Sequence, residues 1–163
     1  MRPWLLALSG GTIAWMLVAR AANAQTATQV VRFQVNAVSQ IGVTGGPAAL
    51  VIGSAVAGSA PTSVTASGTS YAITTNELNQ KITASLDQAL PAGVTLEVAL
   101  AAPDGATSAG SVALTTAGAD VVTGISRTVA SSLPITYRLS ATPMVQISAP
   151  DARTVTFTIV SGT

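Results

Sequence analysis

Apolar residues recur at every second position along most of this chain. The pattern is clearest in VVRFQVNA, KITASL, VTLEVAL, SVALT, ITYRLSA and TVTFTIV, where hydrophobic side chains alternate with polar or small ones. A period of two places the apolar residues on one face of an extended segment. Each of these runs is therefore predicted to be a half-buried strand. No run has a convincing helical pattern, although AGADVVTGIS could form a single helical turn.

Turn-forming residues separate the runs. Glycine, proline and aspartate fall between them, as in GGP at 45–47, PAG at 91–93 and PDG at 103–105, and these residues permit the dihedral angles of chain reversals. Short strands with turns every ~8 to 12 residues are typical of sandwiches and barrels. We expect an all-β, immunoglobulin-like antiparallel sandwich of about eight or nine strands. ALVIG, TSVTA, YAITT and residues 144–147 are shorter strand candidates.

The first 24 residues have the layout of a secretory signal peptide. Arg2 precedes a mostly apolar run at 4–18, and the small-residue triplet ANA follows at 22–24, which is the arrangement that signal peptidase recognises. The alternative is a membrane anchor, but the run is shorter than the about 20 apolar residues that a spanning helix needs. We expect cleavage after Ala24, a single domain over residues 25–163, and secretion to the cell surface or the medium, with the periplasm as an alternative.

The composition argues against several classes of function. The chain has no histidine and no cysteine, so it cannot form disulfides, Ser-His or Cys-His nucleophiles, or the usual zinc sites. After loss of residues 1–24, five basic side chains face six acidic ones, and the net charge of 5 − 6 = −1 lacks the basic cluster that binds nucleic acid. No second apolar run approaches membrane length. The expectation is a protein without nucleic-acid partners and without a membrane span after cleavage.

The acidic residues are scattered. Asp104 and Asp151 occur singly in the turn sequences PDG and PDA, and calcium requires six to eight oxygen ligands, so turn formation is the favoured interpretation. Carboxylate-pair catalysis is open in principle, but no acidic motif supports it. We therefore expect no enzymatic activity, no catalytic residues, no cofactor and no metal.

The segment that follows the expected cleavage site carries Val31, Phe33 and Val35 at alternate positions. A segment of this kind can add as a strand to the open edge of a neighbouring copy. The alternative is that it forms the first strand of its own sandwich. The two interpretations differ only in which molecule supplies the partner edge. Val31, Phe33 and Val35 are the candidate strand-addition residues.

The last strand alternates in the same way. Val155, Phe157 and Ile159 are expected to face the core, and the threonines between them to face solvent. Its expected partner is ITYRLSA, either directly or across a short strand at 144–147. Ice binding by the threonine row would require the same row on adjacent strands, and no such repeat occurs.

The whole layout resembles small secreted bacterial surface proteins of the pilin or biofilm-filament-subunit type. The resemblance rests on the signal peptide, the alternating N-terminal segment, the Ala/Thr/Ser/Gly-rich body and the final TVTFTI run. The chain differs from chaperone-assembled pilins, which usually carry a disulfide and a tyrosine near the C-terminus: it has no cysteine, and its last aromatic residue is Phe157. The resemblance implies a structural subunit that associates with itself or with another surface protein. The alternative is a monomeric module that binds glycan or protein through a loop such as AAPDGATSAGS. Exposed aromatic side chains would favour glycan binding, but Tyr71 and Tyr137 are expected in the core.

Overall fold

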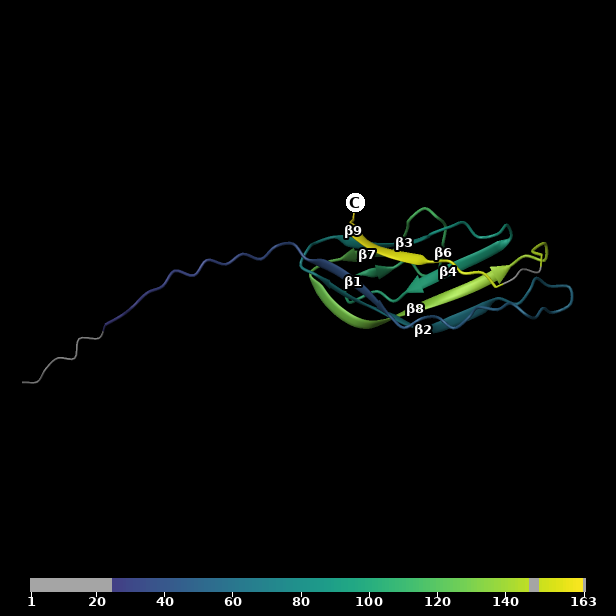
Figure 1. The fold of residues 1–163 in the computed structure, drawn as a ribbon, viewed down its shortest axis with the longest axis horizontal. Coiled ribbons are helices and arrows are strands. Elements are labelled where there is room, and N and C mark those ends of the chain that lie inside the picture. The colour runs from purple at the N-terminus through teal and green to yellow at the C-terminus, as the bar shows by residue number, and fades with distance from the viewer. Residues whose placement is uncertain (1–24, 147–149, 163) are drawn as a thin grey trace, which may run out of the picture. The chain divides into compact units, whose positions relative to one another are not determined.

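The structure is a computed structural model that describes residues 25–146 and 150–162. Its described part is all-β, with antiparallel strands and no helix (Figure 1). The expected signal peptide and part of the expected strand at 144–147 lie outside the described residues. The strands are β1 (Ser39–Thr44), β2 (Val64–Thr75), β3 (Gln80–Leu86), β4 (Val94–Leu100), β5 (Thr107–Ser108), β6 (Val112–Ala113), β7 (Ala119–Ile125), β8 (Thr128–Ala141) and β9 (Val155–Ser161).

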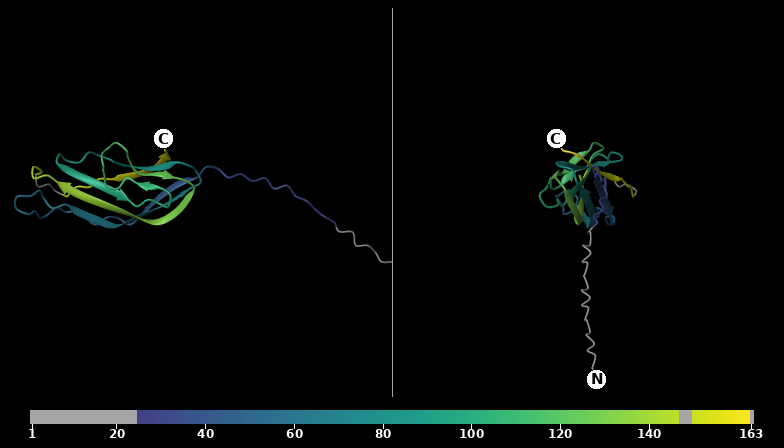
Figure 2. Two further views of the ribbon diagram at one scale, coloured as in Figure 1. Left: turned by 180° about the vertical axis from the view of Figure 1, so that it is seen from behind. Right: turned by 90° about the vertical axis from the view of Figure 1, so that its left-hand side faces the viewer.

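The strands form two antiparallel sheets. One has the order β1-β2-β8-β4-β6, and the other has the order β5-β7-β3-β9. The chain divides into two units, Met1–Gln34 and Val35–Thr163, and every strand belongs to the second unit. The long strands β2 and β8 run side by side along the first sheet (Figures 1 and 2).

Both sheets contribute to one hydrophobic core, which makes the arrangement sandwich-like. Alternation along β3 buries Ile82, Ala84 and Leu86 completely or nearly so, as the period-two pattern predicts. From the other sheet, Val98, Ile135 and both tyrosines, Tyr71 and Tyr137, enter the same cluster. The prediction that the tyrosines belong to the core is confirmed.

The last strand pairs differently from the prediction. β9 pairs with β3 over its whole length, whereas β8 lies in the other sheet between β2 and β4, so the expected pairing of the last two strands is wrong. The expected orientation of β9 is correct, because Val155, Phe157 and Ile159 pack against the core and the threonines between them are exposed. Alternation determines which face of a strand is buried, but it does not determine the partner strand.

Four local predictions are also wrong. AGADVVTGIS contains β7 and no helical turn, and the adjacent residues Val121 and Val122 are both fully buried. ALVIG forms no strand, and neither do residues 144–146. The expected strand at 31–37 is likewise absent, since the first strand begins at Ser39.

A glycine ends β1. Gly45 has a φ of 82°, and a Cβ at this position would lie 2.8 Å from the carbonyl oxygen of Gly68, so only glycine fits this turn. β1 pairs with β2 from Thr75 to Ser70 and no further. Residues 64–69 of β2 therefore have no strand partner on that side among the described residues.

Candidate functional site

The candidate strand-addition residues lie outside both sheets. The exposed fractions of Val31, Phe33 and Val35 are 72%, 91% and 81%, and residues 25–38 (the N-terminal segment) contain no strand. The reason is geometric: Ser39 pairs with Thr75, the last residue of β2. β2 therefore has no residue left to pair with those before Ser39.

Asn76 anchors the base of the N-terminal segment. Its side-chain Oδ1 accepts a hydrogen bond of 2.8 Å from the Val38 amide, and its Nδ2 donates one of 2.8 Å to the Asn36 carbonyl oxygen. The Asn76 amide also donates to the Val38 carbonyl oxygen at 3.1 Å. These contacts fix residues 36–38 to the turn after β2. Val31, Phe33 and Val35 precede the anchored residues.

The opposite end of β2 borders a large cavity. Thr75 pairs with Thr128 at the start of β8, whereas Val64 pairs with Leu139 near the end of β8. Leu139 lines a cavity of about 1080 Å³, which we call the end cavity. Its volume is slightly above the usual range of ligand sites, about 300–1,000 Å³. Apolar side chains form most of its lining, including Leu50, Ile52, Leu90, Val94, Leu139 and Val145.

One wall of the end cavity is residues 49–53, the segment that was expected to be the strand ALVIG. Leu50 and Ile52 are half-buried, while Ala49, Val51 and Gly53 are exposed, so burial alternates as it does in a strand. No backbone hydrogen bond joins residues 49–53 to any other described residue. The segment therefore presents unpaired N–H and C=O groups, which are the groups that an added strand binds.

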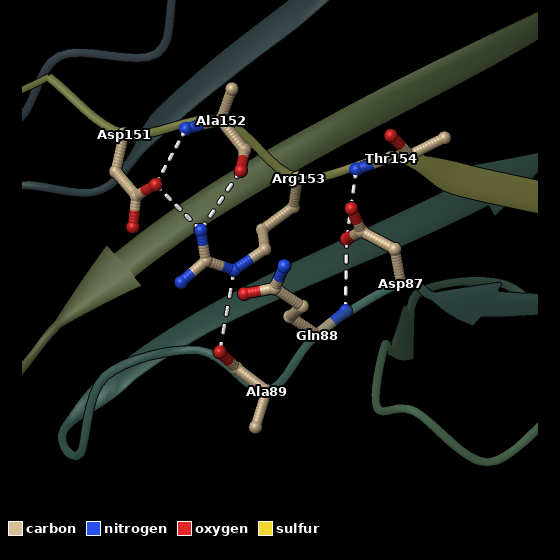
Figure 3. Close-up of polar contacts among 7 residues, drawn as sticks. All are labelled: Asp87, Gln88, Ala89, Asp151, Ala152, Arg153 and Thr154. Atoms are coloured by element: carbon tan, nitrogen blue, oxygen red, sulfur yellow. Dashed lines mark hydrogen bonds and ion pairs between the residues drawn. The ribbon is translucent and has the colours of Figure 1, made fainter.

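Polar contacts connect other segments next to the end cavity (Figure 3). The Asp87 Oδ1 accepts hydrogen bonds from the amides of Gln88 (2.9 Å) and Thr154 (3.0 Å), which ties the turn after β3 to the start of β9. Arg153 donates through Nε to the Ala89 carbonyl oxygen at 3.3 Å. These bonds connect the turn after β3 to the residues that precede β9.

Arg153 and Asp151 form an ion pair beside the end cavity. Arg153 Nη1 lies 2.6 Å from Asp151 Oδ1, and both residues line the end cavity. The hydrogen bond from Arg153, together with that from the Ala152 amide, holds the pKa of Asp151 below its usual value. The structure places Asp151 in an ion pair within an irregular segment before β9, and its interpretation as a turn residue stays a prediction.

The described residues contain no group of three or more histidine, cysteine, aspartate or glutamate side chains that could hold a metal ion. Asp104 lies in an exposed turn. The loop AAPDGATSAGS includes β5, and the Ser108 hydroxyl donates to the Leu100 carbonyl oxygen at 2.6 Å. Nothing helical in the described part has the length and hydropathy required to cross a membrane.

Sequence reasoning selected the N-terminal segment but missed the end cavity. The sequence feature that points to the cavity is the alternation of Leu50 and Ile52 in ALVIG, which is typical of a segment with one buried face. The absence of a backbone partner for that segment depends on distant parts of the chain. Comparisons with protein-family models, with curated proteins and with solved structures found no match to this chain.

Proposed function

We propose that this chain is a secreted, non-enzymatic structural subunit of the cell surface that assembles with copies of itself by β-strand addition through its N-terminal segment. The observation that carries the proposal is the exposure of Val31, Phe33 and Val35, three apolar side chains at alternate positions outside any strand. Contiguous exposed apolar residues mark interaction sites. An extended segment of this pattern gains backbone hydrogen bonds and apolar burial when it joins a sheet edge.

The proposal includes export. Residues 1–24 act as a cleaved signal peptide, the mature protein begins at Gln25, and the subunit is of the pilin or biofilm-filament type with an immunoglobulin-like sandwich. The arrangement of two antiparallel sheets around one core supports the last point. The intact mass of the exported protein tests the first, because retention of residues 1–24 adds their full mass.

Deletion of residues 25–35 from the full chain tests assembly. The deletion retains the residues that Asn76 anchors and removes no side chain of the core cluster, so the exported variant should keep the thermal unfolding midpoint of the wild type. Light scattering after size exclusion and negative-stain microscopy should then show assemblies for wild type and monomers for the variant. A synthetic peptide of residues 25–37 should bind the variant.

Phe33→Asp should have the same effect, because a carboxylate in place of the most exposed of the three residues disfavours burial against a neighbour. The matched control is Val129→Asp on β8, which changes a similarly exposed side chain (80%) and should leave assembly intact. A wild-type protein that stays monomeric at high concentration, with no filaments, would refute the proposal. The second candidate function, a monomeric module that binds glycan or protein, would then be favoured by the end cavity.

A further inference from the structure

We propose that the end cavity is the acceptor site, and that the N-terminal segment of a second copy occupies it and pairs with residues 49–53. The proposal rests on the proposed function and adds the location of the accepting surface. The occupant is a segment of this same chain, since that segment carries exposed apolar residues at alternate positions and the cavity is lined mainly by apolar side chains. The assembly it produces is head-to-tail.

The residue at which the N-terminal segment joins the sheet and the end cavity lie at opposite ends of β2. The N-terminal segment enters the sheet at Ser39, beside Thr75, whereas the end cavity includes Leu139, beside Val64. In Figure 1, β1 begins at the end of the sheet where β8 also begins, and β8 runs from there to the far end. A contact between unlike surfaces at opposite ends is heterologous, so it propagates into filaments or rings instead of closing as a two-fold dimer.

The three apolar residues of the chain's own N-terminal segment, Val31, Phe33 and Val35, cannot reach its own cavity. Phe33 precedes Ser39 by six residues, which span at most about 22 Å, and Val31 reaches no more than about 29 Å. The distance along β2 from Thr75 to Val64 is eleven residues, or about 36 Å at the rise of a strand. Only a second molecule can bring these apolar side chains to the level of the cavity.

The acceptor also supplies backbone groups. Residues 49–53 alternate in burial but have no hydrogen-bond partner on the backbone among the described residues. A donor strand beside them would satisfy these N–H and C=O groups and place its own alternate side chains toward Leu50 and Ile52. An apolar ligand could fill the cavity but would leave those groups unpaired, which is why we assign the site to a strand.

Complementary mixing tests the assignment with exported full-length chains. Phe33→Asp impairs the donor and leaves the cavity intact; Ile52→Asp places a carboxylate in the cavity and leaves the donor intact. Each variant alone should be monomeric, and an equimolar mixture should give dimers with one junction and no larger species. The control pair, Val129→Asp mixed with Phe33→Asp, should still allow the Val129→Asp chain to assemble with itself, because its donor and cavity are both intact.

The outcomes separate the two proposals. If wild type assembles, Phe33→Asp does not, and Ile52→Asp assembles normally by itself, the end cavity is not the acceptor although strand addition stands. If wild type is monomeric or Phe33→Asp assembles normally, the proposed function fails and the acceptor assignment fails with it. Far-UV circular dichroism of each variant establishes that it is folded before it is mixed.

Two proline variants provide a second test that does not place charge in the cavity. Successive N–H groups of a strand point to opposite edges, so Val51→Pro and Ile52→Pro each remove a donor from a different edge of the segment. Neither donor has a backbone partner among the described residues, so both variants should fold. Assembly should fall at least tenfold in apparent affinity for the variant whose lost N–H faces the donor strand. Wild-type assembly by both variants would overturn the pairing with residues 49–53.

Discussion

The Val38 amide donates a hydrogen bond of 2.8 Å to the side-chain Oδ1 of Asn76, and this contact marks the boundary between the anchored and the exposed parts of the N-terminal segment. On one side of it β1 pairs with β2; on the other, Val31, Phe33 and Val35 are exposed. The anchor fixes the point from which the segment leaves the sheet. A donor strand with a fixed point of departure loses less conformational freedom when it binds.

Asn76→Ala should loosen this anchor. The substitution removes the bonds to the Val38 amide and the Asn36 carbonyl oxygen, both of them exposed, and should lower the free energy of unfolding by about 1 kcal/mol. Hydrogen exchange of the Val38 amide should accelerate, which mass spectrometry of peptides that span residues 36–44 can measure. Gln40→Ala, at an exposed position in the paired part of β1, is the control and should leave that exchange rate unchanged.

Thr69→Val should stabilise the protein. Thr69 is 4% exposed, and its Oγ1 has no hydrogen-bond partner within the described structure. A buried hydroxyl without a partner costs about 1–3 kcal/mol, and valine has nearly the same shape and suits a strand. We expect a gain of about 1 kcal/mol in urea unfolding, from removal of that penalty.

Thr75→Val is the matched control, at a similarly buried position of the same strand. The Thr75 Oγ1 contacts the Ser39 Oγ at 2.8 Å and accepts from the Glu77 amide at 3.1 Å, so the same substitution should lower stability here. Equal effects of the two variants would show that the Thr69 hydroxyl is satisfied in solution.

The sequence predicted strands well where one face of the strand is buried and the other is half-exposed. In β3 and β9 the alternation in the sequence is the alternation in burial. It failed for β7, because Val121 and Val122 are neighbours and both fully buried, which interrupts a period of two. The sequence pattern also does not distinguish a paired strand from an unpaired segment. Residues 31–35 and 49–53 alternate like strands, but whether they pair depends on where β2 ends and where Gly45 turns the chain. The end cavity depends on such nonlocal choices and could not be predicted.

Tyr71→Phe should change how stability depends on alkaline pH. Burial raises the pKa of Tyr71 from 10.0 to about 12, so the folded protein keeps this phenol neutral where the unfolded chain ionises. The resulting stabilisation is complete below pH 10 and is lost as the pH rises toward the folded pKa of about 12. Urea unfolding between about pH 8 and 11.5 should therefore show a smaller alkaline loss in the variant than in wild type.

Tyr137→Phe is the comparison for this prediction. Burial also raises the pKa of Tyr137, so this variant too should reduce the alkaline loss. At neutral pH the two should differ, because the Tyr71 hydroxyl donates to the Ala101 carbonyl oxygen at 2.5 Å. Loss of that bond should lower stability by about 1 kcal/mol or more in Tyr71→Phe. Identical neutral-pH stabilities of the two variants would contradict the importance of this contact.

Asp151→Asn should remove an acid-sensitive contribution at the wall of the end cavity. The hydrogen bond from Arg153 lowers the pKa of Asp151 in the folded protein, so the ionised form is favoured by folding. The stabilisation is present above the ordinary aspartate pKa of about 3.9 and is lost as the pH falls through the lowered value. A double-mutant cycle of Asp151→Asn with Arg153→Gln, measured by urea unfolding from about pH 7 down to pH 2.5, should give a small favourable coupling at neutral pH. The coupling should weaken toward the acid end, because protonation of Asp151 leaves an uncharged side chain at position 151 in all four proteins of the cycle. A coupling that persists unchanged at the lowest pH would mean that the ion pair does not account for the link between these two residues.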